Sequence, residues 1–337
     1  MCKKESLYRL AKEIKEFVGV SRKRPIIRVT SALTDTLEFS DAKIIRSFGE
    51  DAAILDIGNG RLLLFAADGI WYKLVSADPF FAGYCAVLVN VNDIVCKGGD
   101  PLALVDILGV PKECDIDKVV RGIIRGCKKF GVSCVGGHLH PDHPIPEISA
   151  AIIGVAEYNK VIFSDLARPG DLIIIGIDLD GKFHEKFKLA WDTTSHKSPK
   201  QIRDMFQAMY IIADEGLATA SKDISNPGVL GSLGMLLEAS QVGGYVYPDK
   251  IPIPENVSIY TWVKTYPGFG VVLTSPEDLA NKCVKILEDH GISASIVGKV
   301  ISDPLLLLKS DNEMAEVFNF SRDKISGRPN RGQLKQI

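Results

Sequence analysis

The chain has 337 residues, about twice the ~150 residues of a common domain, so two domains are expected. Hydrophobic residues make up 46% and charged residues 24%, which is ordinary for a globular protein with a packed core. The 40 basic and 42 acidic side chains nearly cancel, and this balance argues against a nucleic-acid-binding protein.

The sequence also lacks the usual signs of membrane insertion or secretion. No apolar run approaches the ~18 residues of a membrane span, and the N-terminus has no apolar signal-peptide core. The seven cysteines are scattered and none forms Cys-x-x-Cys, a pattern that favours reduced thiols. We therefore expect a cytoplasmic protein that does not enter a membrane.

The first half of the chain predicts helices and mostly locally paired strands. Gly58-Asn59-Gly60 joins two strand-like runs and predicts a hairpin. Residues 80–97 are nearly all apolar and end at Gly98-Gly99, so they predict a buried helix. The other expected elements are helices at 5–18 and 116–130 and strands at 52–57, 61–67, 102–110, 132–135 and 148–156. Residues 1–160 are interpreted as an α+β domain.

The pattern changes near Arg168-Pro169-Gly170, and strands then alternate with helices. The expected elements are helices near 199–220, 228–240 and 277–290 and strands at 172–177, 269–274, 294–300 and 304–309. Residues 161–337 are interpreted as a second domain of the α/β type.

Several aspartates occupy positions where a carboxylate is costly. Asp68 ends the apolar run 62–67, and Asp93 lies near the C-terminus of the apolar helix, where the helix dipole disfavours negative charge. A buried carboxylate costs several kcal/mol unless it is paired or bound to a metal. Asn90, one turn before Asp93, offers a second oxygen ligand. The pattern favours a divalent cation, and for any single acid a structural carboxylate that caps a backbone amide stays open.

Two basic features stand close to these acids in the sequence. Lys222 precedes Asp223, and it either faces a phosphate or is a solvated lysine at a strand edge. The segment Arg22-Lys23-Arg24 precedes the first acidic motif, and it either becomes ordered over a bound nucleotide or is a solvated loop.

A histidine-rich stretch offers a different kind of metal site. His138-Leu-His140-Pro-Asp142-His143 has the ligand types and spacing of a dinuclear zinc motif. Pro144 and Pro146 follow where that motif should lead into a helix, and a helix interior does not tolerate them. Two interpretations stay open: a zinc hydrolase centre, or a polar loop that contacts a ligand or a partner subunit.

Five motifs that occur in order over residues 48–235 resemble motifs of the AIR synthase superfamily. They are Phe48-Gly-Glu-Asp-Ala-Ala, Ala66-Ala67-Asp68, Asn90-Val-Asn-Asp93, Gly136-Gly137-His138 and Lys222-Asp223-Ile-Ser-Asn-Pro-Gly. The first resembles Gly-Asp-Asp-Ala-Ala of thiamine-monophosphate kinase, and the fourth resembles Gly-Gly-His of selenophosphate synthetase. Within the superfamily, the chain is most similar to the archaeal AIR synthase-related group called methanogenesis marker protein 2.

The resemblance implies a two-domain AIR synthase-like fold and a homodimer whose N-terminal sheets form a shared barrel. It also implies that ATP binds at the subunit junction and that magnesium ions bridge its phosphates. The implied magnesium ligands are Asp51, Asp68, Asp93 and Asp223. The further predicted nucleotide-binding residues are Glu50, Asn90, Gly136, Gly137 and His138, and the predicted catalytic residues are Asp93 and Lys222.

The function expected on this basis is magnesium-dependent use of ATP. The enzyme would transfer the γ-phosphate to a small metabolite or coenzyme-biosynthesis intermediate, as a kinase does, or activate it as a synthetase or ligase does. Two alternatives stay open at this point. One is a metal-dependent hydrolase that uses the stretch His138–His143, and the other is a non-catalytic nucleotide-binding maturation partner.

Overall fold

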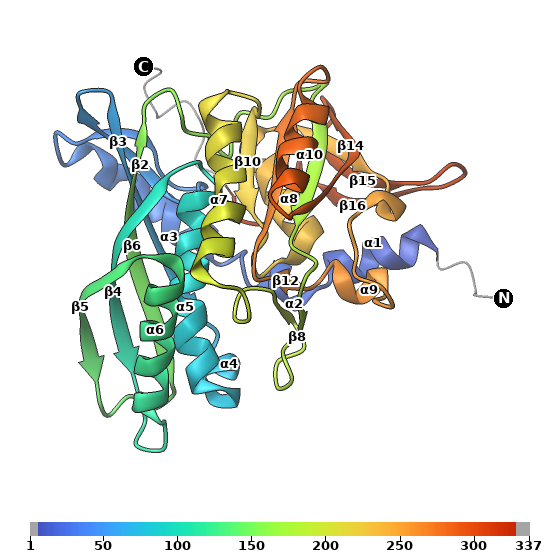
Figure 1. Cartoon of the computed structure of the whole chain (residues 1–337). Coiled ribbons are helices and arrows are strands. Elements are labelled where there is room, and N and C mark those ends of the chain that lie inside the picture. Colours follow the sequence, from blue (N-terminus) through green and yellow to red (C-terminus); the bar gives the residue numbers. More distant parts are fainter. Residues whose placement is uncertain (1–5, 328–337) are drawn as a thin grey trace.

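The structure, a computed structural model, describes residues 6–327, which build two large β-sheets, each covered by helices (Figure 1). The first sheet has six strands in the order β1-β2-β3-β6-β4-β5. Its strands are β1 (Lys43–Arg46), β2 (Ala53–Gly58), β3 (Arg61–Ile70), β4 (Asp100–Gly109), β5 (Ser133–His140) and β6 (Glu147–Glu157). Only β4 and β5 run parallel, joined through a helix, and the other neighbours are antiparallel.

Helices α4 (Tyr72–Ala77), α5 (Pro79–Val95) and α6 (Ile116–Phe130) lie on one side of this sheet (Figure 1). Alternate residues of β3, such as Leu62 and Leu64, are buried, as expected for a strand with one face in the core. Asp78 begins α5 by accepting a hydrogen bond from Phe81 N, and Gly131, in a left-handed conformation, ends α6. The opposite face of the sheet is apolar and exposed.

The second sheet has seven strands in the order β10-β13-β7-β14-β11-β15-β16. Its strands are β7 (Leu172–Ile177), β10 (Ala220–Asp223), β11 (Gly243–Val246), β13 (Gly270–Ser275), β14 (Ser293–Ile301), β15 (Leu305–Lys309) and β16 (Met314–Asn319). Its main helices are α7 (Pro199–Asp214), α8 (Gly228–Ser240) and α10 (Ala280–Asp289). Because β7 is central, the run Ile173–Ile177 is fully buried.

The smaller elements connect these layers. A three-stranded sheet contains β8 (Lys182–Phe183), β9 (Ala190–Asp192) and β12 (Tyr266–Pro267). The short helices are α1 (Leu7–Lys15), α2 (Val18–Ser21), α3 (Ile26–Leu33), α9 (Ile259–Trp262), η1 (Thr34–Glu38) and η2 (Pro248–Lys250). Helix α1 packs on β16, so the start of the chain joins the core of the second sheet through Leu10 and Ile14.

Most of the predicted elements are confirmed, including the hairpin β2–β3 and the buried helix α5. Two boundaries were wrong. The strand predicted at 132–135 extends to His140, so His138 and His140 lie in β5 and not in a loop. The helix predicted at 199–220 ends at Asp214. The sequence pattern did not predict strands β1, β8, β9, β10, β11, β12 and β16, and all of these but β16 have four residues or fewer. The domain boundary at residues 160–161 stays a prediction.

Residues 6–327 bear on two further expectations, that the chain does not enter a membrane and that its cysteines are reduced. No helix there is both long enough and apolar enough to span a bilayer. The cysteines in this range are free thiols, namely Cys85, Cys96, Cys114, Cys127, Cys134 and Cys283.

Helix α5 is held by a close crossing with α6. A Cβ atom at Gly122 would overlap the backbone oxygen of Phe80, and one at Gly83 would overlap the backbone oxygen of Val119. The two helices can therefore approach to backbone contact only because both positions are glycine.

We expect Gly122→Ala to lower the free energy of unfolding by about 2–3 kcal/mol, because a backbone oxygen cannot turn aside as a side chain can. This loss should appear although alanine ordinarily stabilises a helix by about 1 kcal/mol relative to glycine. Val120→Ala, at an exposed position of α6, should change stability by about 0.5 kcal/mol or less. Urea unfolding followed by circular dichroism measures both, and equal stability of Gly122→Ala and the wild type would contradict the packing argument.

Candidate metal and nucleotide site

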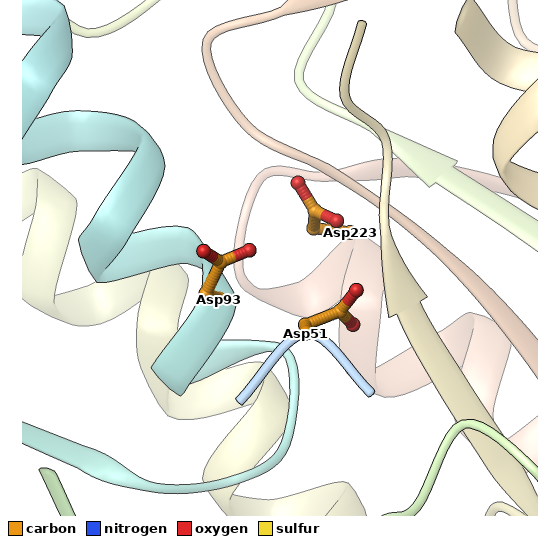
Figure 2. A group of neighbouring side chains, drawn as sticks. All are labelled: Asp51, Asp93 and Asp223. Atoms are coloured by element: carbon orange, nitrogen blue, oxygen red, sulfur yellow. The ribbon is translucent and has the colours of Figure 1, made fainter. Parts of the chain in front are cut away.

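Three aspartates from distant parts of the sequence meet between the two large sheets. Asp51 lies in the bend before β2, Asp93 in the last turn of α5, and Asp223 at the end of β10 (Figure 2). One carboxylate oxygen from each lies within 4.8 Å of the others. That spacing suits a single divalent cation, and carboxylate oxygens are the ligands that magnesium prefers. Three of the four predicted magnesium ligands are thus brought together.

Asp68, the fourth, lies at the same site but outside this group of three. It stands on β3, and together with Asp223 it lines a cavity between the two halves of the molecule. Its charge and that of Asp223 each raise the pKa of the Asp93 carboxyl. The charge of Asp68 is therefore felt at the site, although Asp68 lies outside the group of three with metal-ligand spacing.

Two buried lysines neutralise part of this acidic site. Lys97 Nζ lies 2.9 Å from Asp51 Oδ2 and 3.2 Å from Glu50 Oε2, and it donates to Ser221 O at 2.6 Å. Lys222 Nζ pairs with Asp51 Oδ1 and lies 3.7 Å from Asp223 Oδ1. Lys222 is buried, so it is not a solvated lysine at a strand edge. Both oxygens of Asp51 face an ammonium group.

Glu50, a predicted nucleotide-binding residue, makes structural contacts. Both of its carboxylate oxygens accept a hydrogen bond from Ser164 N at 2.9 Å, and one pairs with Lys97. These contacts tie the loop before β2 to the segment that leads into the second sheet.

Asp93 lacks such a partner. Within residues 6–327, no ion pair involves its carboxylate, although its exposed fraction is only 7%. Burial raises the pKa of Asp93 well above its ordinary range, and the charges of Asp223 and Asp68 raise it further. Burial likewise raises the pKa of Asp68 and lowers that of Lys222. Lys97 and Lys222 offset only part of the free-energy cost of burying these carboxylates. A cation bound at this position would offset the rest.

Asn90 lies one turn before Asp93, as predicted, but it is bonded within its own helix. Its Nδ2 donates to Ala86 O at 2.8 Å, while its buried Oδ1 has no partner among the described residues. The asparagines that line the cavity are Asn92 and Asn226, and neither was proposed as a ligand from the sequence.

The predicted residues Gly136, Gly137 and His138 lie away from the aspartates of their own chain. They belong to β5, the edge strand that is separated from β3 by β6 and β4, and they are exposed. The rings of His138 and His140 lie 4.6 Å apart, and His143 Nδ1 lies 2.6 Å from Ile145 O. Within the described range, the residues with metal-ligand geometry are the three aspartates and not these histidines. The zinc-centre interpretation therefore gains no support.

A cavity of about 270 Å³ adjoins the acidic site, and the sequence analysis missed it. Its walls include five aromatic residues, Trp71, Phe81, Phe187, Trp191 and Tyr266. Arg22 and Lys23 also line it, and the Arg22 guanidinium lies 4.3 Å from the centre of the Trp71 ring. The rings come from segments almost 200 residues apart, so no local pattern could have revealed the cavity.

Comparison with known proteins identifies the family of this chain. Residues 49–156 match the family model of the AIR synthase related protein N-terminal domain, and residues 168–308 match that of the C-terminal domain. The chain belongs to the AIR synthase related protein family. The expected two-domain AIR synthase-like fold is thereby confirmed.

Relatives in this family match over most of the chain. An uncharacterized protein of Methanocaldococcus jannaschii is 41% identical over 322 residues, which cover 96% of this chain and 99% of that protein. The phosphoribosylformylglycinamidine cyclo-ligase of Pyrococcus furiosus is 33% identical, with 84% and 92% covered. The selenide, water dikinase of Sulfurovum sp. is 28% identical, with 79% and 80% covered.

Solved structures share the AIR synthase related fold at lower identity. T. maritima PurL complexed with ATP is 20% identical with a TM-score of 0.68, over 81% of this chain and 46% of that one. The chain thus matches about half the length of PurL. AaThiL complexed with AMPPCP and TMP is 20% identical with a TM-score of 0.63, over 86% and 96%. These likenesses establish the fold.

The unpaired Asp93 predicts how stability without metal depends on pH. Its pKa in the folded chain lies above its ordinary value of 3.8, so between the two values the folded chain holds more protons than the unfolded chain. Stability should therefore fall as pH rises through that window, and Asp93→Asn should abolish this loss. The mutant should equal or exceed the wild type at about pH 8, with a smaller difference at about pH 5.

Denaturant titrations in a chelating buffer at the two pH values measure this effect. Asp249→Asn, in the short helix η2, is the matched control and should follow the wild type. If Asp93 were a structural cap, Asp93→Asn would instead lose about 1–3 kcal/mol at the higher pH.

Proposed function

We propose that this protein is a magnesium-dependent enzyme that transfers the γ-phosphate of ATP to a small acceptor. The observation that carries the proposal is the meeting of Asp51, Asp93 and Asp223, with Asp93 in no ion pair among the described residues and with a pKa that burial raises despite the charges of Lys23 and Lys97. We choose ATP as the nucleotide because PurL was solved with ATP and AaThiL with AMPPCP. Acids from both halves of the chain would then surround the polyphosphate.

The residues of the site have distinct roles in this proposal. Asp51, Asp93 and Asp223 would hold the magnesium ion, and Asp68 would face the same ion or a second one. Magnesium, when bound, neutralises charge on the phosphate oxygens and orients the γ-phosphate. Lys222, which pairs with Asp51 here, would turn its ammonium group toward a phosphate oxygen.

The chemical step follows from this arrangement. An oxygen of the acceptor forms a bond to the γ-phosphorus, the bond from that phosphorus to the β–γ bridging oxygen breaks, and ADP leaves. An acceptor hydroxyl would give its proton to a nearby carboxylate, for which Asp68 on the cavity wall is available, whereas an acceptor carboxylate would attack without losing a proton. The chain holds the reacting groups in line and excludes water, and positioning of this kind supplies much of the catalysis in phosphoryl transfer.

We further propose that the active form is a homodimer. The outer face of the first sheet exposes apolar side chains on adjacent strands, among them Phe65, Val105, Ile107 and Ile153. An unpartnered apolar sheet face of this kind marks an interaction surface. A second copy seated there would cover it, and the β5 residues Gly136, Gly137 and His138 would then reach a nucleotide shared between subunits.

The metal assignment predicts how mutants respond to nucleotide. Saturation with magnesium AMPPCP at 100 times its Kd should stabilise the wild type by about 2.7 kcal/mol. Asp93→Asn and Asp223→Asn should keep the fold but lose most of that stabilisation, whereas Asp249→Asn should keep it. Thermal-shift titrations with magnesium and with EDTA measure this difference. A full nucleotide response in Asp93→Asn would remove the metal assignment at that residue.

The dimer proposal predicts the effect of a charge on the outer sheet face. Phe65→Glu should yield a folded monomer, because one buried unpaired carboxylate per subunit costs several kcal/mol at an interface. Val120→Glu, at a similarly exposed site on helix α6, should leave the dimer intact. Light scattering at micromolar concentration distinguishes the two, and a monomeric wild type would exclude a site shared between subunits.

A further inference from the structure

The cavity beside the acidic site is built as a receptor for a flat ring. Trp71 and Phe187 meet edge to face with ring centres 5.9 Å apart at 87°, and Phe187 and Tyr266 lie 6.1 Å apart. These three rings come from the N-terminus of α4, from the segment before β9 and from β12. Aromatic walls of this kind stack well on a planar ligand and bury much of its surface.

Three residues that line the cavity have a buried polar atom with no partner among the described residues. They are Trp71 and Trp191, whose Nε1 atoms are hydrogen-bond donors, and Asn92, whose Oδ1 is an acceptor. The Asn92 amide is fixed in orientation, because its Nδ2 donates to Gly268 O at 3.0 Å. A buried donor or acceptor that stays unpaired costs about 1–3 kcal/mol. A ligand that offers both an acceptor and a donor would remove such costs.

The acidic end of the cavity indicates which substrate the ring belongs to. Asp68 and Asp223 line the cavity directly, so a ligand inside it would lie beside the proposed magnesium and γ-phosphate. The adenine of ATP is held away from its γ-phosphate by the ribose and two further phosphoryl groups. A ring at this end therefore fits the acceptor better than the nucleotide base.

We propose that the phosphate acceptor is a planar heteroaromatic compound whose ring carries both a hydrogen-bond donor and an acceptor. The ring packs against Phe187 and Tyr266 and meets Trp71 at the edge of the indole, where its polar atoms bond to Trp71 Nε1 and Asn92 Oδ1. The oxygen that receives the phosphate points toward Asp68 and Asp223. This assignment rests on the proposed function for the identity of the reaction, but ring binding itself can be tested separately.

The test uses uracil and 5,6-dihydrouracil as probes, because they carry the same polar groups but only uracil is planar and aromatic. Saturation-transfer NMR on the full-length protein should show that uracil binds. Dihydrouracil should bind at least about fivefold more weakly, because it cannot make an aromatic stacking contact. Trp71→Phe keeps a ring but removes the donor, and Asn92→Leu removes the acceptor. Each should weaken uracil binding about fivefold or more.

Trp262→Phe is the matched control, because the Trp262 indole already donates to Pro252 O and does not line the cavity. It should bind uracil as the wild type does. Circular dichroism identifies any variant that fails to fold, and for such a variant Trp71→Met or Asn92→Ala removes the same donor or acceptor. Equal binding of the two probes, or full binding by both cavity variants, would overturn the proposal.

Nucleotide competition distinguishes failure of this inference from failure of the proposed function. Uracil binding that persists with saturating magnesium AMPPCP supports an acceptor site. Displacement of uracil by the nucleotide would assign the cavity to adenine and overturn the inference while leaving ATP use intact. Uracil binding with no nucleotide response in the thermal-shift titrations would instead refute the proposed function and leave the ring site standing.

Discussion

The cost of burying Asp93 governs the arrangement of this protein. The carboxylate sits at the C-terminal end of an apolar helix, where the helix dipole and the low polarity of the core both oppose its charge. Two of the neighbouring lysines, Lys97 and Lys222, are already bound to Asp51, Glu50 and Asp223. The charge of Lys23 also favours the ionised form of Asp93, but burial outweighs it and raises the pKa of Asp93. The chain therefore buries a carboxyl group without an ion pair at the junction of its two sheets, and the proposed cation would offset the cost of ionising it.

The two lysines give this junction its shape before any ligand arrives. Lys97 comes from just beyond α5 and joins the Asp51 loop of the first sheet to Ser221 on β10 of the second. Lys222, also on β10, reaches back to the same aspartate. Acids and bases from both halves thus alternate across the boundary, and the ion pairs fix the distance between the halves. A ligand that binds the acids would compete with these pairs, which couples its binding to the contact between the sheets.

How much of this could be seen in the sequence depended on whether the signal was local. Asp93 stood out because its neighbours along one helix are apolar, and the helices and the β2–β3 hairpin followed from spacing and turn residues. Asp51 and Asp223 were placed by resemblance to known motifs, since nothing near them in the sequence says that they meet. The pairing of Lys97 with Glu50 and Asp51 depends on where α5 ends.

The strand that contains His138 was taken for a loop because glycines and prolines surround it. The aromatic cavity brings together Trp71 and Tyr266, and only the tertiary fold joins such distant residues.

The docking of α1 against β16 sets the order in which the chain can finish folding. Lys15 Nζ lies 2.7 Å from Asp323 Oδ2, although 308 residues separate them in the sequence. On the ribosome, α1 is made long before β16, against which it packs. Until β16 has been made, the apolar face of α1, with Leu10 and Ile14, lacks that partner. The second sheet therefore cannot be completed until both of the large sheets have been synthesised.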